Sequence, residues 1–185
     1  MPGFRDVHVY PAHPDLARAK QLVAGRTGTA VMYTCDQPPC DRIAQIVRTD
    51  LGRIGIHVVV KAFGLDELFT RMARQGEPFD LGFAGWVSDY PDPDDTLDVL
   101  LASGQVPSFD DPVWRARLAL AGRLSGPERY LAYGRLDGEL ARDAAPWAAF
   151  ANRPAVAFLS ARIGCRVYQP VYGIDLAALC VRHRG

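Results

Sequence analysis

Residues 30–62 read AVMYTCDQPPCDRIAQIVRTDLGRIGIHVVVKA and carry the clearest fold signal in the chain. The first part of this stretch, Ala30–Thr34, is a short apolar run of strand length, and its last part, Ile56–Ala62, contains three consecutive valines. Between these runs we expect a helix with Asp41 at its N-cap, because apolar residues recur there at close to the 3.6-residue period of a helix. The buried positions expected for this helix are Ile43, Ile46, Val47, Leu51 and Ile54. A strand, a helix and a strand joined by short connections are typical of a parallel crossover unit.

The same alternation continues on both sides of this unit. Upstream, His13-Pro14-Asp15 predicts the start of a helix that ends before Gly25. The apolar face of that helix comprises Leu16, Ala19, Leu22 and Val23. Downstream, a helix over Asp66–Gln75 precedes another buried strand over Phe79–Gly85. Near-continuous apolar strands indicate a parallel or mixed sheet with helices on both faces, which is the α/β class.

The remainder of the chain changes character near Pro146. Before it, helices are expected from about Asp95 to Leu101, over Pro112–Leu124 and over Pro127–Asp143, and the last two open with a proline. After it, short extended pieces are separated by Pro and Gly. These pieces are Trp147–Ala151, Val156–Leu159, Cys165–Tyr168 and Leu176–Val181.

The composition excludes several classes of function. The 185 residues are 49% hydrophobic and 23% charged, which is typical of a globular chain and not of a disordered one. Lys plus Arg and Asp plus Glu both number 21, so neither nucleic acid nor an anionic membrane is an expected partner. No apolar run approaches the roughly 20 residues of a membrane span, and no secretory signal is visible at the start of the sequence.

The four cysteines leave their chemistry open at this level. Cys35 and Cys40 flank Asp-Gln-Pro-Pro, whereas Cys165 and Cys180 stand 15 residues apart. The second spacing is too wide for the paired cysteines of a zinc site and the histidines are scattered, so no metal is expected. A disulfide between Cys35 and Cys40 is one interpretation, and buried free thiols are the other.

The common catalytic signatures are absent. The sequence contains no Gly-x-Ser-x-Gly elbow, no phosphate-binding loop and no Gly-x-Gly-x-x-Gly after a strand. No histidine pair stands at helical spacing with a glutamate between. Their absence makes an enzyme a less favoured interpretation without excluding one, because catalytic residues can assemble from distant parts of a chain.

The segment after the strand Phe79–Gly85 carries the candidate binding residues. Ligands of open parallel sheets bind beyond the carboxyl ends of the strands, where this segment begins. Gly85 permits close approach of a ligand, Trp86 offers a flat apolar wall and Asp89 offers a partner for a cation. A buried core aromatic is the alternative interpretation of Trp86. The acidic residues Asp92, Asp94 and Asp95 are interpreted as turn formers and a helix N-cap.

This segment resembles the signature of a known family. Residues 85–93, GWVSDYPDP, resemble the Gly-Trp-x-x-Asp-x-x-Asp/Glu-Pro motif of family 5 extracellular solute-binding proteins, the oligopeptide-, dipeptide- and nickel-binding receptors of ABC importers. Four further segments are similar to family segments in the same order: residues 13–22 (HPDLARAKQL), 51–58 (LGRIGIHV), 79–81 (FDL) and 145–147 (APW). Each segment alone is short, and their common order and spacing carry the resemblance.

The resemblance implies a fold and a site. It implies a periplasmic-binding-protein-like type II fold, in which two α/β lobes close on a ligand about a hinge. Asp89 matches the acid that pairs with the α-ammonium group of a bound peptide, and Gly85 and Trp86 match positions that flank the ligand backbone. With Val87 between them, these residues are the ligand-binding set that the resemblance implies. The family is not catalytic, so the resemblance also implies that the chain is not an enzyme and has no catalytic residues and no cofactor.

The resemblance also implies an organisation and partners. Family members are much longer, and the similarity covers only their C-terminal portion, so the lobe is expected to be incomplete. We expect residues 1–155 to form the C-terminal α/β lobe and residues 156–185 to return to the absent N-terminal lobe. The expected partners are a peptide or small solute and the ABC permease subunits. The expected location is extracytoplasmic, in the periplasm or at the cell surface, with a lipid anchor in an absent N-terminal region.

Two other functions stay open from the sequence. One is a non-catalytic α/β interaction domain that has lost solute binding, and the other is a small α/β enzyme whose catalytic residues lie apart in the sequence. The solute itself is not specified by the sequence.

Overall fold

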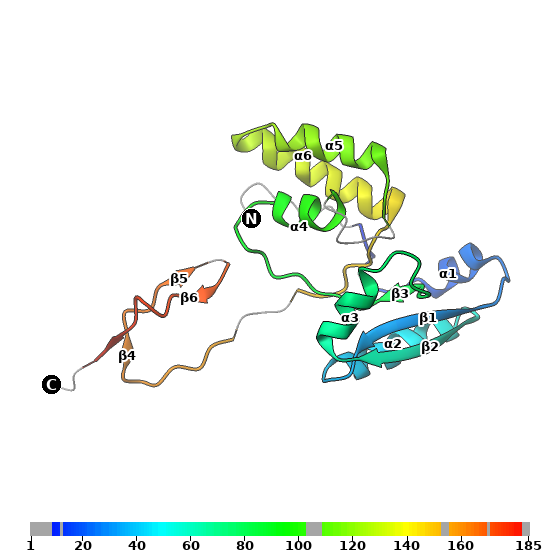
Figure 1. Ribbon diagram of the computed structural model, residues 1–185, viewed down its shortest axis with the longest axis horizontal. Coiled ribbons are helices and arrows are strands. Elements are labelled where there is room, and N and C mark those ends of the chain that lie inside the picture. The colour runs from blue at the N-terminus through cyan, green and yellow to red at the C-terminus, as the bar shows by residue number, and fades with distance from the viewer. Residues whose placement is uncertain (1–8, 12, 103–108, 153–155, 170, 183–185) are drawn as a thin grey trace.

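The computed structural model describes residues 9–11, 13–102, 109–152, 156–169 and 171–182. Figure 1 shows three regions in chain order: a small sheet with its helices, a group of helices, and an extended C-terminal tail that projects away from both. The candidate site lies on the connection between the first region and the second, and the tail touches that connection.

The sheet contains three parallel strands, β1 (Gly28–Cys35), β2 (Ile56–Phe63) and β3 (Leu81–Gly82), in the order β2-β1-β3. The pairing of β1 with β2 runs in register from Gly28 opposite Ile56 to Cys35 opposite Phe63. Helix α2 (Cys40–Gly52) connects these two strands, which confirms the predicted crossover unit. The assignment to the α/β class with a parallel sheet is confirmed.

Helices cover the two faces of the central strand. On one face, Met32 packs with Ala44 of α2 and with Val58 of β2. On the other face, Tyr33 packs with Leu68 of α3 (Leu65–Met72). Alternate residues of β1 therefore belong to two separate cores, as the period of a strand requires.

The edge strand β2 is less buried than its apolar run predicts. Val59 is 38% exposed, and the residues on either side of it alternate between buried and exposed positions. β2 has a neighbouring strand on one side only, so its side chains are covered less than those of the central strand β1.

Two predictions about α2 are wrong. Pro39, not Asp41, occupies the N-cap, and Asp41 lies in the first turn. The predicted buried residue Ile46 is 61% exposed, because the helix turns Ala44 toward the sheet, with Val47 and Leu51 packed beside it. The 3.6-residue period located the apolar face, and the small side chain of Ala44 allows the helix to lie close to the strands.

The first helix is present but does not bury its apolar face. Helix α1 (Leu16–Val23) has Asp15 at its N-cap, whose carboxylate accepts the backbone N–H of Arg18 at 2.8 Å. Ala24 ends the helix in the left-handed conformation. No residue of α1 is buried, and Leu22 is 63% exposed.

The strand predicted over Phe79–Gly85 is shorter than expected. Only Leu81–Gly82 is a strand, and flanking backbone bonds from Asp80 to Val31 (2.9 Å) and from Phe83 to Tyr33 (2.8 Å) extend its pairing with β1. After Phe83 the chain leaves the sheet, so the glycine and tryptophan of the candidate site stand on a loop.

The helical region has its own core. Helix α4 (Asp94–Leu97) continues into the π-helical turn η1 (Asp98–Ala102), and helices α5 (Pro112–Gly122) and α6 (Gly126–Glu139) follow, the latter continuing into η2 (Leu140–Ala144). The three expected helices are thus confirmed. Their buried core comprises Leu97, Leu101, Trp114, Leu118, Ala121, Tyr133, Leu136 and Leu140.

The tail contains only two-residue strands. The strand β4 (Ile163–Gly164) pairs antiparallel with β7 (Cys180–Val181), and β5 (Tyr168–Gln169) pairs antiparallel with β6 (Gly173–Ile174). The extended pieces expected over residues 147–151 and 156–159 form no strand in the structure, although both segments are described.

Both cysteine pairs form disulfides. Cys35 and Cys40 join the end of β1 to the start of α2 with their Cα atoms 5.5 Å apart, which confirms the disulfide interpretation. Cys165, the residue after β4, and Cys180 of β7 are joined with their Cα atoms 5.3 Å apart. Across the described ranges, no group of three or more His, Cys, Asp or Glu side chains is placed to hold a metal ion. Within the same ranges, no helix has the length and apolar character needed to cross a membrane.

Candidate binding site on the loop after β3

The candidate site stands where the strand order reverses. From β1 the chain crosses through α2 to β2 on one side, and α3 then leads it back across to β3 on the other side of β1. The crevice at such a reversal, beyond the carboxyl ends of the strands, is where open parallel sheets bind ligands. The loop of residues 83–93 leaves β3 at this edge, as the sequence predicted.

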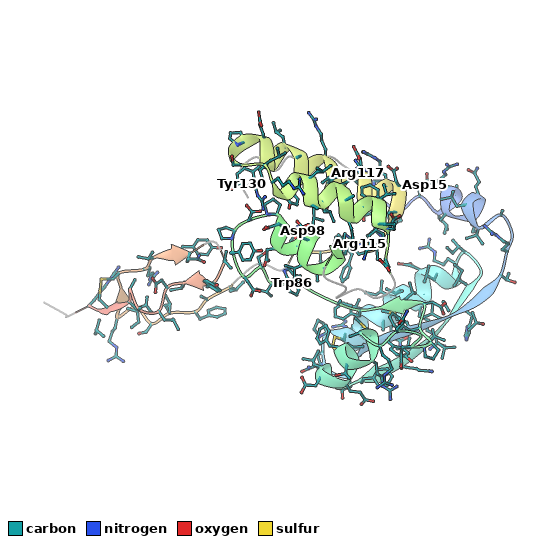
Figure 2. The ribbon with its side chains drawn as sticks, turned by 45° about the horizontal axis from the view of Figure 1, so that its top comes forward. Asp15, Trp86, Asp98, Arg115, Arg117 and Tyr130 are labelled. Atoms are coloured by element: carbon teal, nitrogen blue, oxygen red, sulfur yellow. A yellow bond between two sulfur atoms is a disulfide. The ribbon has the colours of Figure 1, made fainter. Side chains whose placement is uncertain are left out.

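A buried carboxylate holds this loop against α4. The Oδ2 atom of Asp95 accepts the indole Nε1–H of Trp86 at 2.9 Å and the backbone N–H of Asp89 at 3.1 Å. Asp95 itself is fully buried. Figure 2 shows Trp86 beside the helical segment that carries Asp98, which lies about one turn after Asp95. Two residues of the predicted set therefore share one buried acceptor.

All four predicted site residues are exposed on the loop. Trp86 is 40% exposed, so the alternative that it is a buried core aromatic is wrong, and Val87 is 78% exposed. Asp89 is exposed, and its carboxylate makes no hydrogen bond or ion pair with the residues that the structure describes. At Gly85, an added Cβ atom would meet no heavy atom within 4 Å, so open space surrounds this position.

The tail contributes a contact that the sequence did not indicate. The hydroxyl of Tyr172, in the turn between β5 and β6, donates a hydrogen bond to the backbone carbonyl of Asp89 at 2.6 Å. The two residues are 83 positions apart in the chain. Nothing in the local pattern around Tyr172 points to this partner.

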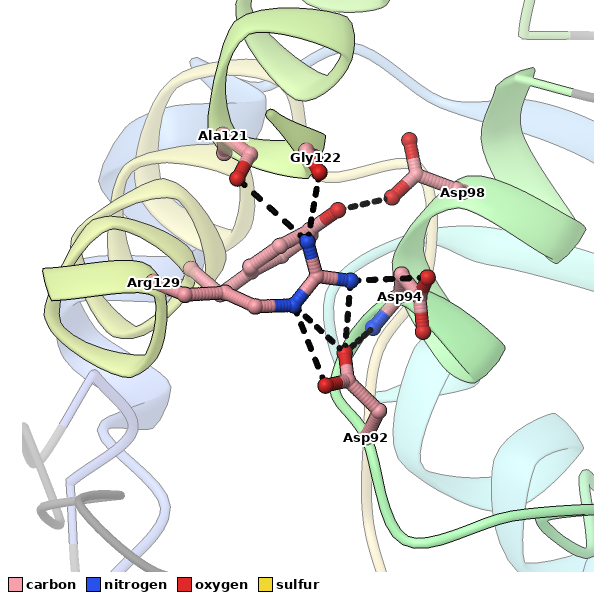
Figure 3. Close-up of polar contacts among 7 residues, drawn as sticks. Asp92, Asp94, Asp98, Ala121, Gly122 and Arg129 are labelled. Atoms are coloured by element: carbon pink, nitrogen blue, oxygen red, sulfur yellow. Dashed lines mark hydrogen bonds and ion pairs between the residues drawn. The ribbon is translucent and has the colours of Figure 1, made fainter. Parts of the chain in front are cut away.

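An arginine from α6 holds the far end of the loop (Figure 3). The Nη2 atom of Arg129 lies 2.9 Å from Asp92 Oδ1 and 2.8 Å from Asp94 Oδ2, and its Nε atom lies 3.0 Å from Asp92 Oδ2. Its Nη1 atom donates to the carbonyl of Gly122 at the end of α5, at 2.8 Å. The guanidinium thus ties the loop to both helices of the α5–α6 pair.

The two carboxylates beside Arg129 differ electrostatically. Burial works to raise the pKa of Asp92, but its hydrogen bonds with Arg129 and Asp94, together with the charge of Arg129, outweigh burial and hold this pKa below the usual range. Burial and the neighbouring carboxylate of Asp92 raise the pKa of Asp94. Arg129 also lies over the ring of Tyr133, whose hydroxyl donates to Asp98. The carboxylates of Asp92 and Asp94 are therefore occupied by contacts within the chain, around the guanidinium of Arg129.

The interpretation of Asp92 as a turn former is confirmed, since its carboxylate accepts the backbone N–H of Asp94 at 3.1 Å. The predicted N-cap is wrong, because Pro93 occupies that position. Sequence reasoning missed the anchoring roles of Asp95 and Arg129. The only available signal was the density of aspartates after Trp86, and it pointed equally well to solvated turn residues.

Chemically, the arrangement suits binding. An exposed carboxylate with no partner in the described chain stands beside a half-exposed indole, on a loop held at both ends by charge-assisted hydrogen bonds. A cation-bearing ligand with an apolar portion matches these two groups.

Comparison with known sequences identifies similar proteins. Residues 1–108 match the family described as bacterial extracellular solute-binding proteins, family 5 Middle. The "Probable di/tripeptide-binding protein 5" of Pseudomonas aeruginosa is 35% identical over 97 residues, which cover 50% of this chain and 18% of that protein.

Solved structures share the fold. "Clavulanic acid biosynthesis oligopeptide binding protein 2" matches 98% of this chain and 37% of its own, with a TM-score of 0.86 and 20% identity. A dipeptide binding protein from Pseudoalteromonas in complex with Met-Leu matches 97% of this chain and 38% of its own (TM-score 0.71, 20% identity). The ABC transporter-associated periplasmic binding protein DppA from Helicobacter pylori, in complex with peptide STSA, matches 79% of this chain and 31% of its own (TM-score 0.64, 26% identity). The chain thus spans well under half the length of these relatives.

Proposed function

The chain belongs to family 5 of the bacterial extracellular solute-binding proteins, and we propose that it forms the part of an ABC-importer receptor that binds peptides or a similar amine-bearing solute. The observation that carries this proposal is the exposed Asp89 carboxylate beside Trp86, at the edge of the sheet where ligands bind. Membership in this family also confirms that the chain is not an enzyme, and it places the chain outside the cytoplasm.

Two relatives support the choice of ligand. The Helicobacter pylori protein was solved with the peptide STSA, and the Pseudoalteromonas protein was solved with Met-Leu. Both ligands carry an α-ammonium group at neutral pH. We propose that Asp89 pairs with this group and that Trp86, Val87 and Gly85 flank the adjoining peptide backbone.

The physical basis is a carboxylate that is positioned before the ligand arrives. A charge-assisted hydrogen bond between a carboxylate and an ammonium group is about twice as strong as a neutral one. The loop that carries Asp89 is already held by Asp95 and by Arg129, so little ordering is required on binding.

The organisation proposed for the receptor follows from the tail. Residues 156–182 expose large apolar side chains, including Phe158 at 95% and Leu176 at 76%. We propose that residues 1–155 form one lobe, that residues 156–185 pack on a second lobe outside this chain, and that the ligand lies in the cleft between them. The further partners proposed are ABC permease subunits, with lipid anchoring through a segment outside this chain.

A titration with matched ligands tests the assignment of Asp89. The ¹⁵N-labelled chain is titrated with Ala-Ala-Ala and with its N-acetylated form, and the Trp86 indole and Asp89 amide signals are followed by NMR. We expect saturable shifts with a dissociation constant of about 1–10 mM for the free tripeptide, because this chain supplies only part of the contacts. The N-acetylated tripeptide, which lacks the ammonium group, should produce no saturable shift.

Two variants complete that experiment. Asp89→Asn should weaken the free tripeptide at least about tenfold, since it removes the charge and keeps the shape. Asp50→Asn, on an exposed part of α2, should leave binding unchanged. Equal binding of both ligands, binding that Asp89→Asn does not affect, or no shift with either ligand would overturn the proposed role and favour an interaction domain that does not bind solute.

A further inference from the structure

Asp95 is a fully buried carboxylate whose two oxygens differ. Its Oδ2 atom accepts both the Trp86 indole N–H (2.9 Å) and the Asp89 backbone N–H (3.1 Å). Its Oδ1 atom is buried and has no hydrogen-bond partner in the described part of the chain. Burying a carboxylate in this way is costly, so a side chain of this kind is commonly retained for what its bonded oxygen holds.

Both peptide groups of Asp89 are held while its side chain is left unbonded. The carboxylate of Asp95, on α4, accepts the N–H of Asp89, and the hydroxyl of Tyr172, in the tail, donates to the Asp89 carbonyl. These two bonds restrict the backbone on either side of the Asp89 Cα atom, and the backbone sets the direction in which the carboxylate can point.

The nearby guanidinium of Arg129 does not help Asp95 to hold Trp86 and Asp89. Arg129 is engaged by Asp92 and Asp94 and by the carbonyl of Gly122. Within the described residues, Asp95 forms no ion pair, so its bonded oxygen serves the N–H groups of Trp86 and Asp89 alone.

We propose that Asp95 is a positioning residue, which sets the indole of Trp86 and the carboxylate of Asp89 at a fixed spacing for the ligand. This inference rests on the proposed function in so far as Trp86 and Asp89 meet the ligand. The arrangement of the two groups by Asp95 is a property of the ligand-free chain and can be measured there.

A merely structural role for Asp95 would produce a different result. With a structural role alone, Asp95 would be an acidic residue in the first turn of α4 that stabilises the helix N-terminus and the fold as a whole. In that case its replacement would lower the unfolding temperature without a selective effect on the Trp86 indole. Asp66, an exposed acidic residue in the first turn of α3, provides the matched control.

The test measures hydrogen exchange of the Trp86 indole N–H and the Asp89 amide by NMR in the ligand-free chain. Asp95→Ala should accelerate exchange at both sites about tenfold or more, the effect of losing one hydrogen bond. Asp95→Asn, which retains an acceptor of the same size, should restore most of the protection, and Asp66→Ala should leave both signals unchanged. Unchanged exchange in Asp95→Ala, or an Asp95→Asn variant that resembles Asp95→Ala, would overturn the positioning role.

A second measurement needs no variant and covers the case in which Asp95→Ala does not fold. In the deuterated wild-type chain, a scalar coupling across the hydrogen bond should connect Trp86 Nε1 with the carboxyl carbon of Asp95. Absence of that coupling would also overturn the proposal.

The same variants separate this inference from the proposed function. If Ala-Ala-Ala binds, Asp95→Ala should weaken it about tenfold and Asp95→Asn should restore the affinity. If the tripeptide does not bind to the wild-type chain but the exchange pattern appears as expected, the proposed function fails and the arrangement by Asp95 stands. If the tripeptide binds but exchange does not respond to Asp95→Ala, the positioning role fails alone.

Discussion

The helical region, residues 94–144, and the tail, residues 156–182, are both rich in apolar side chains and use them in opposite ways. The helical region buries Leu118, Tyr133 and Leu140 completely. The tail leaves Phe158 95% exposed, and its only buried residue in the described ranges is Gly164. Apolar content alone therefore does not predict a core.

The difference lies in the length of the elements. Helices α5 and α6 have 11 and 14 residues, enough to present a continuous apolar face to a neighbour. The strands of the tail have two residues each and cannot form a layer with an inside. The disulfide between Cys165 and Cys180 holds the tail locally in place of a core.

The largest expected effect comes from Leu118→Ala. Removing this fully buried side chain of α5 should lower the free energy of unfolding by about 2–5 kcal/mol, through lost burial and the cavity left behind. Chemical denaturation measures the change. Leu120→Ala, on the exposed side of the same helix, should change it by less than about 0.5 kcal/mol.

Phe158→Ala in the tail is the control that can break the comparison. Because the ring is 95% exposed, its loss should also change the free energy of unfolding by less than about 0.5 kcal/mol. A cost similar to that of Leu118→Ala would mean that the tail is part of the cooperative core, and the contrast between the two regions would be lost.

Arg129→Ala should have the next largest effect. It leaves Asp92 and Asp94 without their shared cation and should lower the free energy of unfolding by about 2–3 kcal/mol, somewhat less than for a fully buried pair. Arg129→Lys should recover part of the loss, because it restores the charge but not the planar fork. Arg115→Ala, which breaks an exposed pair with Asp110, should cost less than about 1 kcal/mol, and an equal cost for Arg115 and Arg129 would contradict the prediction.

Asp137→Asn in α6 should have a smaller effect than Leu118→Ala or Arg129→Ala, and it is stabilising. Burial raises the pKa of Asp137, so the folded state carries a penalty that is present once pH rises above this pKa and is absent below the unfolded value, about 3.9. The variant should gain about 0.5–1 kcal/mol near neutral pH. The gain should fade as pH decreases toward about 4.

Denaturation curves at the two pH values measure the Asp137 effect. Asp143→Asn, an exposed acid on the following helical turn, serves as the control and should show no such gain. A gain that persists unchanged at low pH would show that removal of the charge is not its cause.

The parallel crossover unit could be predicted because its signal is local. The valine run of β2 and the periodic apolar residues of α2 stand in contiguous sequence, and a strand, a helix and a strand joined by short connections are typical of a parallel crossover. The position of Trp86 and Asp89 could be predicted for the same reason, since both lie on the loop that follows β3. The exposure of Ile46 and Val59 could not, because it depends on which neighbours reach each face.

The supports of the site could not be predicted, because they come from distant parts of the chain. Arg129 lies 37 residues from Asp92, and Tyr172 lies 83 residues from Asp89. Read in its own segment, Arg129 is an ordinary helical arginine, and Tyr172 is an exposed aromatic residue. The burial of Asp95 likewise arises only when α4 packs on its neighbours.

Residue patterns within short segments were enough to predict the α/β class, the order of the elements and the family of binding proteins. The way the loop after β3 is held emerged only in the folded chain, where Asp95, Arg129 and Tyr172 converge on it from two helical segments and the tail. Hydrogen bonds and ion pairs are selected by distance in space, which local sequence patterns do not encode. The exposure of the apolar side chains of the tail likewise depends on where the rest of the folded chain lies.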